Sequence, residues 1–242
     1  MSKYYTTMTE ETNLSQKTGS ALVVSPQFQI LSSTIINRCI FMQNLIQQII
    51  YISHGPELVG AKRALKKFPN PKARVDFLCS FPYKDDDPVV TTVFNFSRSL
   101  FIELYELRNV LAHEIWSSSD NHPDLILFSS LDENARLQMA SGRLWHIDDT
   151  TAQETHEAII RFISSVKIIS CDNLYLAIKD ADLCNLCFLN IINVLSESDP
   201  ARKEEARQTF FVYKGISHLF EFSKELPKSL EFTASRNKSI NN

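Results

Sequence analysis

Apolar residues recur every three or four positions through most of this chain, the spacing that places them on one face of an α-helix. The clearest run covers residues 26–51 and follows Ser25-Pro26, where the proline suits the first helical position. The face that we expect to be buried consists of Phe28, Leu31, Ile35, Cys39, Met42, Ile46 and Ile49. Proline and glycine divide the next segment, so we predict one helix from Glu57 to Phe68 and another from Lys72 to Cys79.

A second long apolar helix is predicted from Val89 to Trp116. It follows Asp85-Asp86-Asp87-Pro88, where carboxylates stabilise a helix N-terminus and proline is accepted in the first turn. Its expected buried stripe consists of Val90, Phe94, Phe101, Leu104, Leu107 and Leu111.

The pattern changes after this helix. Residues 117–123 are polar and predict a loop, whereas Leu125–Phe128 is a short apolar run that predicts a strand. Leu137 and Met139 alternate with polar neighbours and indicate a second strand, and residues 144–147 indicate a third. We therefore expect a small β-hairpin or meander at about residues 124–147, inserted between helices.

The rest of the chain predicts more helices: one from Asp148 to about Lys179, one from Asp180 to Leu195, and one from Pro200 to near Phe222. Residues 1–24 and 223–242 are polar without a sustained period, which predicts a disordered tail at each end. The expected organisation is one mainly α-helical domain, an antiparallel bundle over residues 25–222 with the β-hairpin insertion.

Composition narrows the possible functions. The chain has 242 residues, is 44% hydrophobic and contains five glycines, so it can bury a core but offers neither common glycine-rich phosphate loop. Its net charge of -3 means that nucleic-acid binding would depend on a local basic patch. No apolar stretch of about 18 residues lacks strong polar interruptions, so we expect no membrane-spanning helix.

The five cysteines are an odd number, and the N-terminus lacks the basic-then-apolar order of a secretory signal. Reduced thiols in a cytoplasmic protein are therefore expected.

The most informative stretch is residues 108–113, which read Arg-Asn-Val-Leu-Ala-His near the end of the predicted central helix. Arginine binds phosphate oxygens through a rigid fork, and histidine is well suited to proton transfer near neutral pH. Asn109 and His113 are four residues apart and share a helix face. Arg108 and His113 are separated by roughly 7.5 Å along the axis, so only the long arginine side chain can bring its guanidinium beside the imidazole.

These residues resemble the motif of the HEPN superfamily, whose name stands for higher eukaryotes and prokaryotes nucleotide-binding. The resemblance extends over about residues 26–180 as architecture, and its specific residues are Arg108, Asn109 and His113. It implies a homodimer formed through the motif helices and metal-independent RNA cleavage without a cofactor. It also implies a setting in toxin–antitoxin or antiviral defence systems, with an antitoxin or defence protein as partner.

In the mechanism that this resemblance suggests, His113 acts as a general base on the RNA 2′-hydroxyl, or as the acid that protonates the leaving oxygen. Arg108 stabilises the charge that develops on the phosphorane oxygens. Asn109 orients the imidazole or contacts phosphate. The products are a 2′,3′-cyclic phosphate and a 5′-hydroxyl.

Two alternatives remain open for the motif. An arginine and a histidine near a helix end often interact only with the last carbonyls or with a carboxylate, and Glu103, Glu106 and Glu114 are available partners. The chain could also be a non-catalytic HEPN-like module that binds RNA, a nucleotide or a protein.

Two further patterns carry candidate chemistry. Lys62, Arg63, Lys66 and Lys67, followed by Lys72 and Arg74, form a basic cluster that could follow an RNA backbone or be a solvated helix surface. Cys184 and Cys187 have the spacing of half a zinc site, but no second cysteine pair exists and their neighbours are apolar. We therefore predict that both thiols belong to the core and that the protein holds no metal.

Overall fold

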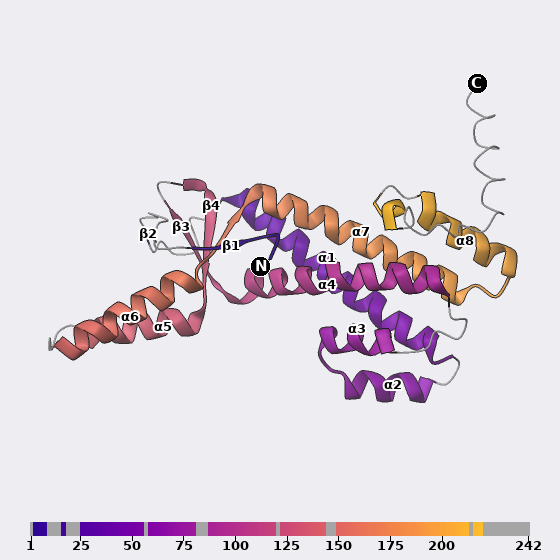
Figure 1. The fold of residues 1–242 in the computed structure, drawn as a ribbon, viewed down its shortest axis with the longest axis horizontal. Helices are drawn as coiled ribbons and strands as arrows, with labels where there is room; N and C mark the ends of the chain where they lie inside the picture. Colours follow the sequence, from indigo (N-terminus) through magenta and orange to yellow (C-terminus); the bar gives the residue numbers. More distant parts are fainter. Residues whose placement is uncertain are drawn as a thin grey trace, which may run out of the picture.

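The computed structural model describes residues 2–8, 16–17, 25–55, 58–80, 87–119, 122–143, 149–212 and 215–219. Its helices are α1 (Pro26–Ser53), α2 (Leu58–Lys67), α3 (Pro71–Ser80), α4 (Pro88–His113), α5 (Leu131–Arg143), α6 (Asp149–Ser165), α7 (Cys171–Ser196) and α8 (Pro200–Val212), with a 3-10 turn at Ser217–Leu219. Its strands are β1 (Thr6–Thr7), β2 (Gln16–Lys17), β3 (Ile115–Ser119), β4 (His122–Ser129) and β5 (Lys167–Ser170). The described chain is mainly α-helical with a small antiparallel sheet, which confirms the expected fold class (Figure 1).

The core lies between α1, α4 and α7. All the residues predicted for the buried faces of α1 and α4 are buried, because the helical spacing of the apolar side chains points them toward the two neighbouring helices. Phe94 of α4 meets Phe188 of α7, and Ser97 accepts a hydrogen bond from Cys184. Later residues of α4 therefore face earlier residues of α7, so these two helices run antiparallel.

The two ends of α4 are fixed by different devices. At the N-terminal end, Asp87 Oδ1 accepts hydrogen bonds from the backbone N–H groups of Val89 and Val90, which caps the helix. At the other end the helix stops at His113, three residues earlier than predicted. Trp116 lies in β3 instead, and its Nε1 donates a hydrogen bond to the carbonyl of Leu111 at 3.2 Å.

The sheet has the strand order β1-β5-β4-β3-β2, with every neighbouring pair antiparallel. Strands β3 and β4 form a hairpin directly after α4. The strand predicted at Leu125–Phe128 lies within β4, but the hairpin begins and ends earlier than the insertion predicted at about residues 124–147. Part of the expected loop at 117–123 belongs to β3.

The predicted second strand is wrong, because Leu137 and Met139 lie in α5. This segment contains good helix formers, and Leu137 packs on a small apolar cluster of Leu127, Phe162 and Val166. Met139 is 61% exposed, so the alternation of apolar and polar residues was not a sign of a strand. The third predicted strand, residues 144–147, lies outside the described residues.

The single helix predicted from Asp148 to about Lys179 is also wrong. Helix α6 ends at Ser165, and the β-branched residues of Lys167–Ser170 pair with β4 as strand β5. A capping box between Ser170 and Asn173 then begins α7, which continues through Asp180 to Ser196. The predicted helix boundary at residue 180 therefore lies inside α7.

The N-terminal segment contributes to the fold, contrary to the tail expected over residues 1–24. Tyr4 is fully buried, and its hydroxyl donates a hydrogen bond to Asp180 Oδ2 at 3.0 Å. Residues 6–7 pair with β5, and residues 16–17 pair with β3. The expected C-terminal tail, residues 223–242, lies outside the described residues.

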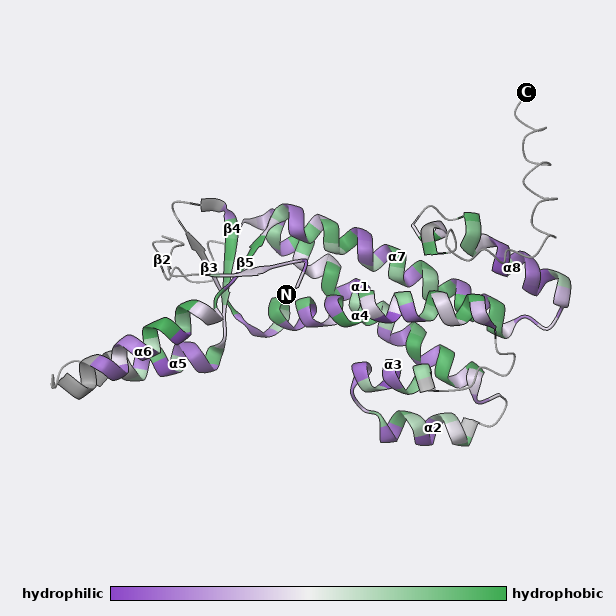
Figure 2. Ribbon diagram, viewed as in Figure 1, coloured by the Kyte–Doolittle hydropathy of each residue, from purple (hydrophilic) through white to green (hydrophobic). Residues whose placement is uncertain are grey.

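Helices α5 and α6 form an arm that projects beyond the sheet, away from the three long helices (Figure 1). Hydrophobic residues are frequent along α1, α4 and α7, whereas α5 and α8 carry many hydrophilic residues (Figure 2). Among the described helices, none combines the length and apolar character needed to cross a membrane.

Candidate functional site

Arg108, Asn109 and His113 come together at the C-terminal end of α4. The guanidinium Nη1 of Arg108 lies 3.1 Å from His113 Nε2 and 3.1 Å from Asn109 Oδ1. The arginine side chain thus reaches along more than one helical turn to the imidazole, as its length permits. The structure brings together the three residues that the sequence predicted as a site.

The contact between Arg108 and His113 is a hydrogen bond for one form of the imidazole only. A guanidinium has only N–H donors and accepts no hydrogen bond, so Nε2 of His113 must be the acceptor. This contact therefore requires the neutral ring with its proton on Nδ1. A basic ring nitrogen is therefore held directly beside a permanent positive charge.

The arginine is anchored against the bundle, while the histidine is open to solvent. His113 is exposed, whereas Arg108 is half-buried and its Nε is buried without a hydrogen-bond partner. Near Arg108 lies the buried thiol of Cys39 on α1. Burial raises the pKa of Cys39 to about 12, and the positive charge of Arg108 partly opposes this change.

The three glutamates that could have paired with the motif each pair with a lysine instead. Lys3 Nζ lies 3.9 Å from Glu103, and Lys72 Nζ lies 3.9 Å from Glu106. Lys167 from β5 forms an ion pair with Glu114. Within the described ranges, no carboxylate lies at ion-pair distance from Arg108 or His113, so the purely structural carboxylate pairing considered for them is not what this fold contains.

Tyr5 and Lys167 lie close to each other beside this end of α4, and the sequence did not predict this arrangement. The ammonium group of Lys167 lies 5.8 Å from the ring centroid of Tyr5. Burial raises the pKa of Tyr5, as do the negative charges of Glu106 and Glu114. The pairing of β1 with β5 brings residues 5 and 167 together, and no local pattern in the sequence predicts that pairing.

The basic cluster separates in space. Lys62, Arg63, Lys66 and Lys67 are exposed on α2, which packs on α1, and none of them has a recorded contact with the motif. Lys72 at the start of α3 contacts Glu106, three residues before Asn109. Arg74 has a structural role, because its Nε donates a hydrogen bond to the carbonyl of Phe68 at 2.7 Å.

Cys184 and Cys187 are buried core residues, as predicted. Burial raises the pKa of both thiols, to about 11 for Cys187. Within the described ranges, no three His, Cys, Asp or Glu side chains gather in a way that could hold a metal ion.

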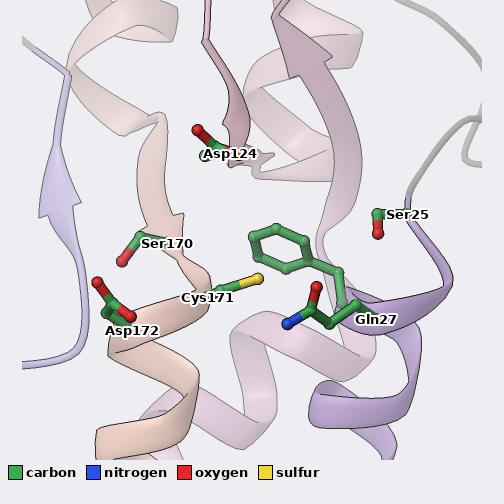
Figure 3. A pocket seen from close by; sticks show the side chains of 7 residues that line it. Ser25, Gln27, Asp124, Ser170, Cys171 and Asp172 are labelled. Atoms are coloured by element: carbon green, nitrogen blue, oxygen red, sulfur yellow. The ribbon is translucent and has the colours of Figure 1, made fainter.

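A separate cavity of about 400 Å³ lies where α1 and α7 begin beside β4. Figure 3 shows the side chains of Asp124, Cys171 and Asp172 around this cavity, which Phe28 also lines. Its remaining lining residues are Ser25, Gln27 and Ser170. None of the motif residues lines it, and its carboxylates suit a ligand that donates hydrogen bonds better than one that carries phosphate.

Comparisons of the chain with protein-family models, with curated proteins and with solved structures found no match.

Proposed function

We propose that this protein is a metal-independent endoribonuclease of the HEPN type, with Arg108, Asn109 and His113 as its catalytic residues. One observation carries the proposal: a single guanidinium nitrogen of Arg108 lies 3.1 Å from both the imidazole of His113 and the amide oxygen of Asn109. A fixed cation beside an exposed, neutral imidazole is what 2′-hydroxyl attack on a phosphodiester requires.

The reaction begins when an RNA phosphate approaches the exposed His113. Arg108 N–H groups then donate to the phosphate oxygens, which frees Nε2 of His113 to remove the proton from the 2′-hydroxyl. The 2′-oxygen attacks phosphorus, and the bond from phosphorus to the 5′-oxygen breaks. Arg108 stabilises the negative charge that develops on the phosphorane oxygens in the transition state. The products are a 2′,3′-cyclic phosphate and a 5′-hydroxyl.

The leaving 5′-oxygen needs a proton, and each chain has one motif histidine. The proposal therefore includes a homodimer in which His113 of a second copy, in its protonated form, supplies this proton and becomes neutral. It also includes a role as a toxin or antiviral defence effector, the setting that the motif resemblance implies.

Lys72 supports a path for RNA along α3 and toward α2. Its side chain is 49% exposed beside Glu106 on the motif helix, and the exposed Lys62, Arg63, Lys66 and Lys67 follow on the neighbouring helix. Exposed cations of this kind can each neutralise a phosphate of an RNA strand.

The second candidate is a non-catalytic module that binds RNA, a nucleotide or a protein partner. The cavity beside Phe28 favours a binding role, because about 400 Å³ lies in the size range of small-molecule sites, although its carboxylates suit a ligand without phosphate.

The test is an assay of a single-stranded RNA with the purified protein in excess EDTA. We expect cleavage into fragments with 2′,3′-cyclic phosphate and 5′-hydroxyl ends, and complete resistance at a position where one 2′-hydroxyl is replaced by hydrogen. Cleavage of the 2′-deoxy position would contradict the mechanism. Tight binding of RNA or of a nucleotide without turnover would select the non-catalytic module.

A further inference from the structure

Glu114 is the acidic residue closest to the motif in the sequence, because it directly follows His113. It lies at the C-terminal cap of α4, where the backbone becomes extended. Its side chain is 17% exposed, and its Oε2 is buried without a hydrogen-bond partner. A carboxylate in such a place is unfavourable unless a cation compensates it.

Lys167 is the cation that compensates Glu114. Its Nζ donates to Glu114 Oε1 across the junction between α4 and β5. The ring of Tyr5 lies 5.8 Å from the same ammonium group, so three segments far apart in the sequence meet at Glu114, the residue that follows His113. Lys167 is itself 21% exposed, which leaves little water to screen the ion pair.

This pairing matters for the chemistry of the imidazole. The charged and titratable groups around this end of α4 are Arg108, Glu106 and Glu114 on the helix, Lys72 on α3, Lys167 on β5, Cys39 on α1 and Tyr5 in the N-terminal segment. An uncompensated Glu114 would attract a protonated His113, and the protonated ring can no longer accept the hydrogen bond from Arg108. The same free carboxylate would repel a phosphodiester.

We propose that Lys167 is a positioning residue of the Arg108–His113 site: by binding Glu114, it prevents that carboxylate from pairing with His113 and leaves the imidazole in contact with Arg108. The last part of the argument, that this arrangement serves RNA cleavage, rests on the proposed function. The electrostatic part concerns the folded protein alone and can be tested without RNA.

The first experiment follows the His113 ring by NMR as the pH is changed, in the full chain without RNA. In Lys167→Met we expect the midpoint of the His113 titration to move to higher pH by about one pH unit, the effect of an opposite charge that becomes free to act at close range. In Glu114→Gln/Lys167→Met the midpoint should return to within about 0.3 pH unit of the wild type, since interacting pairs reveal themselves by such non-additivity.

The double variant separates the proposal from a simpler effect. If the same rise persisted when both Glu114 and Lys167 were replaced, Lys167 would act through its own charge alone, and the proposal would be wrong. An unchanged midpoint in Lys167→Met would also overturn it. Lys167→Arg keeps the cation and should titrate like the wild type.

Two further variants control for general effects of a substitution and for failure of Lys167→Met to fold. Arg136→Met removes a distant ion pair, with Glu133 on α5, and should leave the His113 titration unchanged. If Lys167→Met does not fold, Glu114→Asp provides a second route, because it keeps both charges but shortens the reach of the carboxylate to Lys167. The midpoint should then rise as well, and an unchanged midpoint would count against the proposal.

A second experiment uses RNA cleavage. Lys167→Met should lower kcat/KM about tenfold at neutral pH and move the acidic limb of the pH profile to higher pH, while Glu114→Gln/Lys167→Met should recover most of the loss. If the wild type cleaves no RNA, the proposed function fails, while the NMR result still decides the role of Lys167. If cleavage depends on Arg108 and His113 but the titration midpoints do not depend on Glu114, only the inference about Lys167 fails.

Discussion

The two ends of α4 each hold an arginine, and the partners of the two arginines differ. At the N-terminal end, Arg207 of α8 donates its Nε to Asp87 Oδ2 at 2.6 Å, and this carboxylate is 4% exposed and also caps the helix. At the C-terminal end, Arg108 donates to His113 and Asn109 and has no carboxylate partner among the described residues.

The difference shows how a structural arginine can be told from a candidate functional one. Asp87 satisfies Arg207 with an opposite charge, so this pair holds α8 against the start of α4. Arg108 keeps its full positive charge beside a neutral ring, and the nearby Glu103, Glu106 and Glu114 are compensated by lysines. Among the described residues Arg108 therefore has no carboxylate partner, at the position where the proposed mechanism places the phosphate.

The largest effects should come from the same substitution at each end. Arg108→Met should reduce RNA cleavage by about a thousandfold, because it removes the donor that stabilises the transition state. Its free energy of unfolding should change by less than about 1 kcal/mol.

Arg207→Met should affect stability and not activity. It should lower the free energy of unfolding by about 3 kcal/mol, because it leaves a buried carboxylate without its cation, and the folded fraction should cleave RNA at the unchanged rate. Activity assays and urea denaturation of both variants measure the two effects.

His113→Gln serves as the control at the motif end, because it removes the base while keeping a polar side chain. It should match Arg108→Met in activity and the wild type in stability. The comparison breaks down if Arg108→Met proves as destabilising as Arg207→Met, since Arg108 would then be a structural residue as well.

The next largest effect should be a loss of free energy of unfolding at alkaline pH. In the half of α4 that carries the motif, the thiol of Cys39 donates a hydrogen bond to the carbonyl of Leu104. The opposite end of the helix is stabilised by the ion pair between Arg207 and Asp87. Burial raises the pKa of Cys39 from 9.0 to about 12 and that of Cys187 to about 11. The folded state thus favours the protonated thiols. Their contribution is complete below about pH 9 and is lost as the pH rises toward these higher values.

At pH 10 each such thiol should lower the stability by about 1.4 kcal/mol relative to pH 8. Urea denaturation at both pH values measures the loss. Cys39→Ala should be less stable than the wild type at pH 8 and should lose less stability between pH 8 and pH 10. A wild-type stability that stays flat over this interval would show that thiol ionisation is not coupled to unfolding.

The smallest effect is expected at Lys72, on the exposed side of the motif end. Lys72→Ala should weaken RNA binding a few-fold and reduce the slope of log affinity against log salt by about 0.7, the value for one phosphate contact with a single strand. The free energy of unfolding should change by less than about 0.5 kcal/mol, because the ion pair with Glu106 is exposed. Titrations of labelled RNA at several salt concentrations measure the slope, and Arg136→Ala is the control. An unchanged slope would place the RNA path elsewhere.

Long periodic segments could be predicted from the sequence. The buried faces of α1 and α4 follow from helical spacing alone, and the proline and aspartate before α4 mark its beginning. Short segments were predicted less well, because a few apolar residues can fit either a helix or a strand. Leu137 and Met139 alternate with polar residues as in a strand, but both lie in a helix. The strand at Lys167–Ser170 was missed because its apolar residues also continue the helical pattern of α6.

The sequence by itself determined the composition of the motif and its position near the end of a long helix, because both depend on residues only a few positions apart. It also determined that the long side chain of Arg108 could bring its guanidinium to His113. The tertiary structure decided which charges surround that pair. Lys3, Lys72 and Lys167 lie at ion-pair distance from the three glutamates only because separate elements converge on α4. Such long-range convergence depends on how strands and helices pack, and no spacing within the chain encodes it locally.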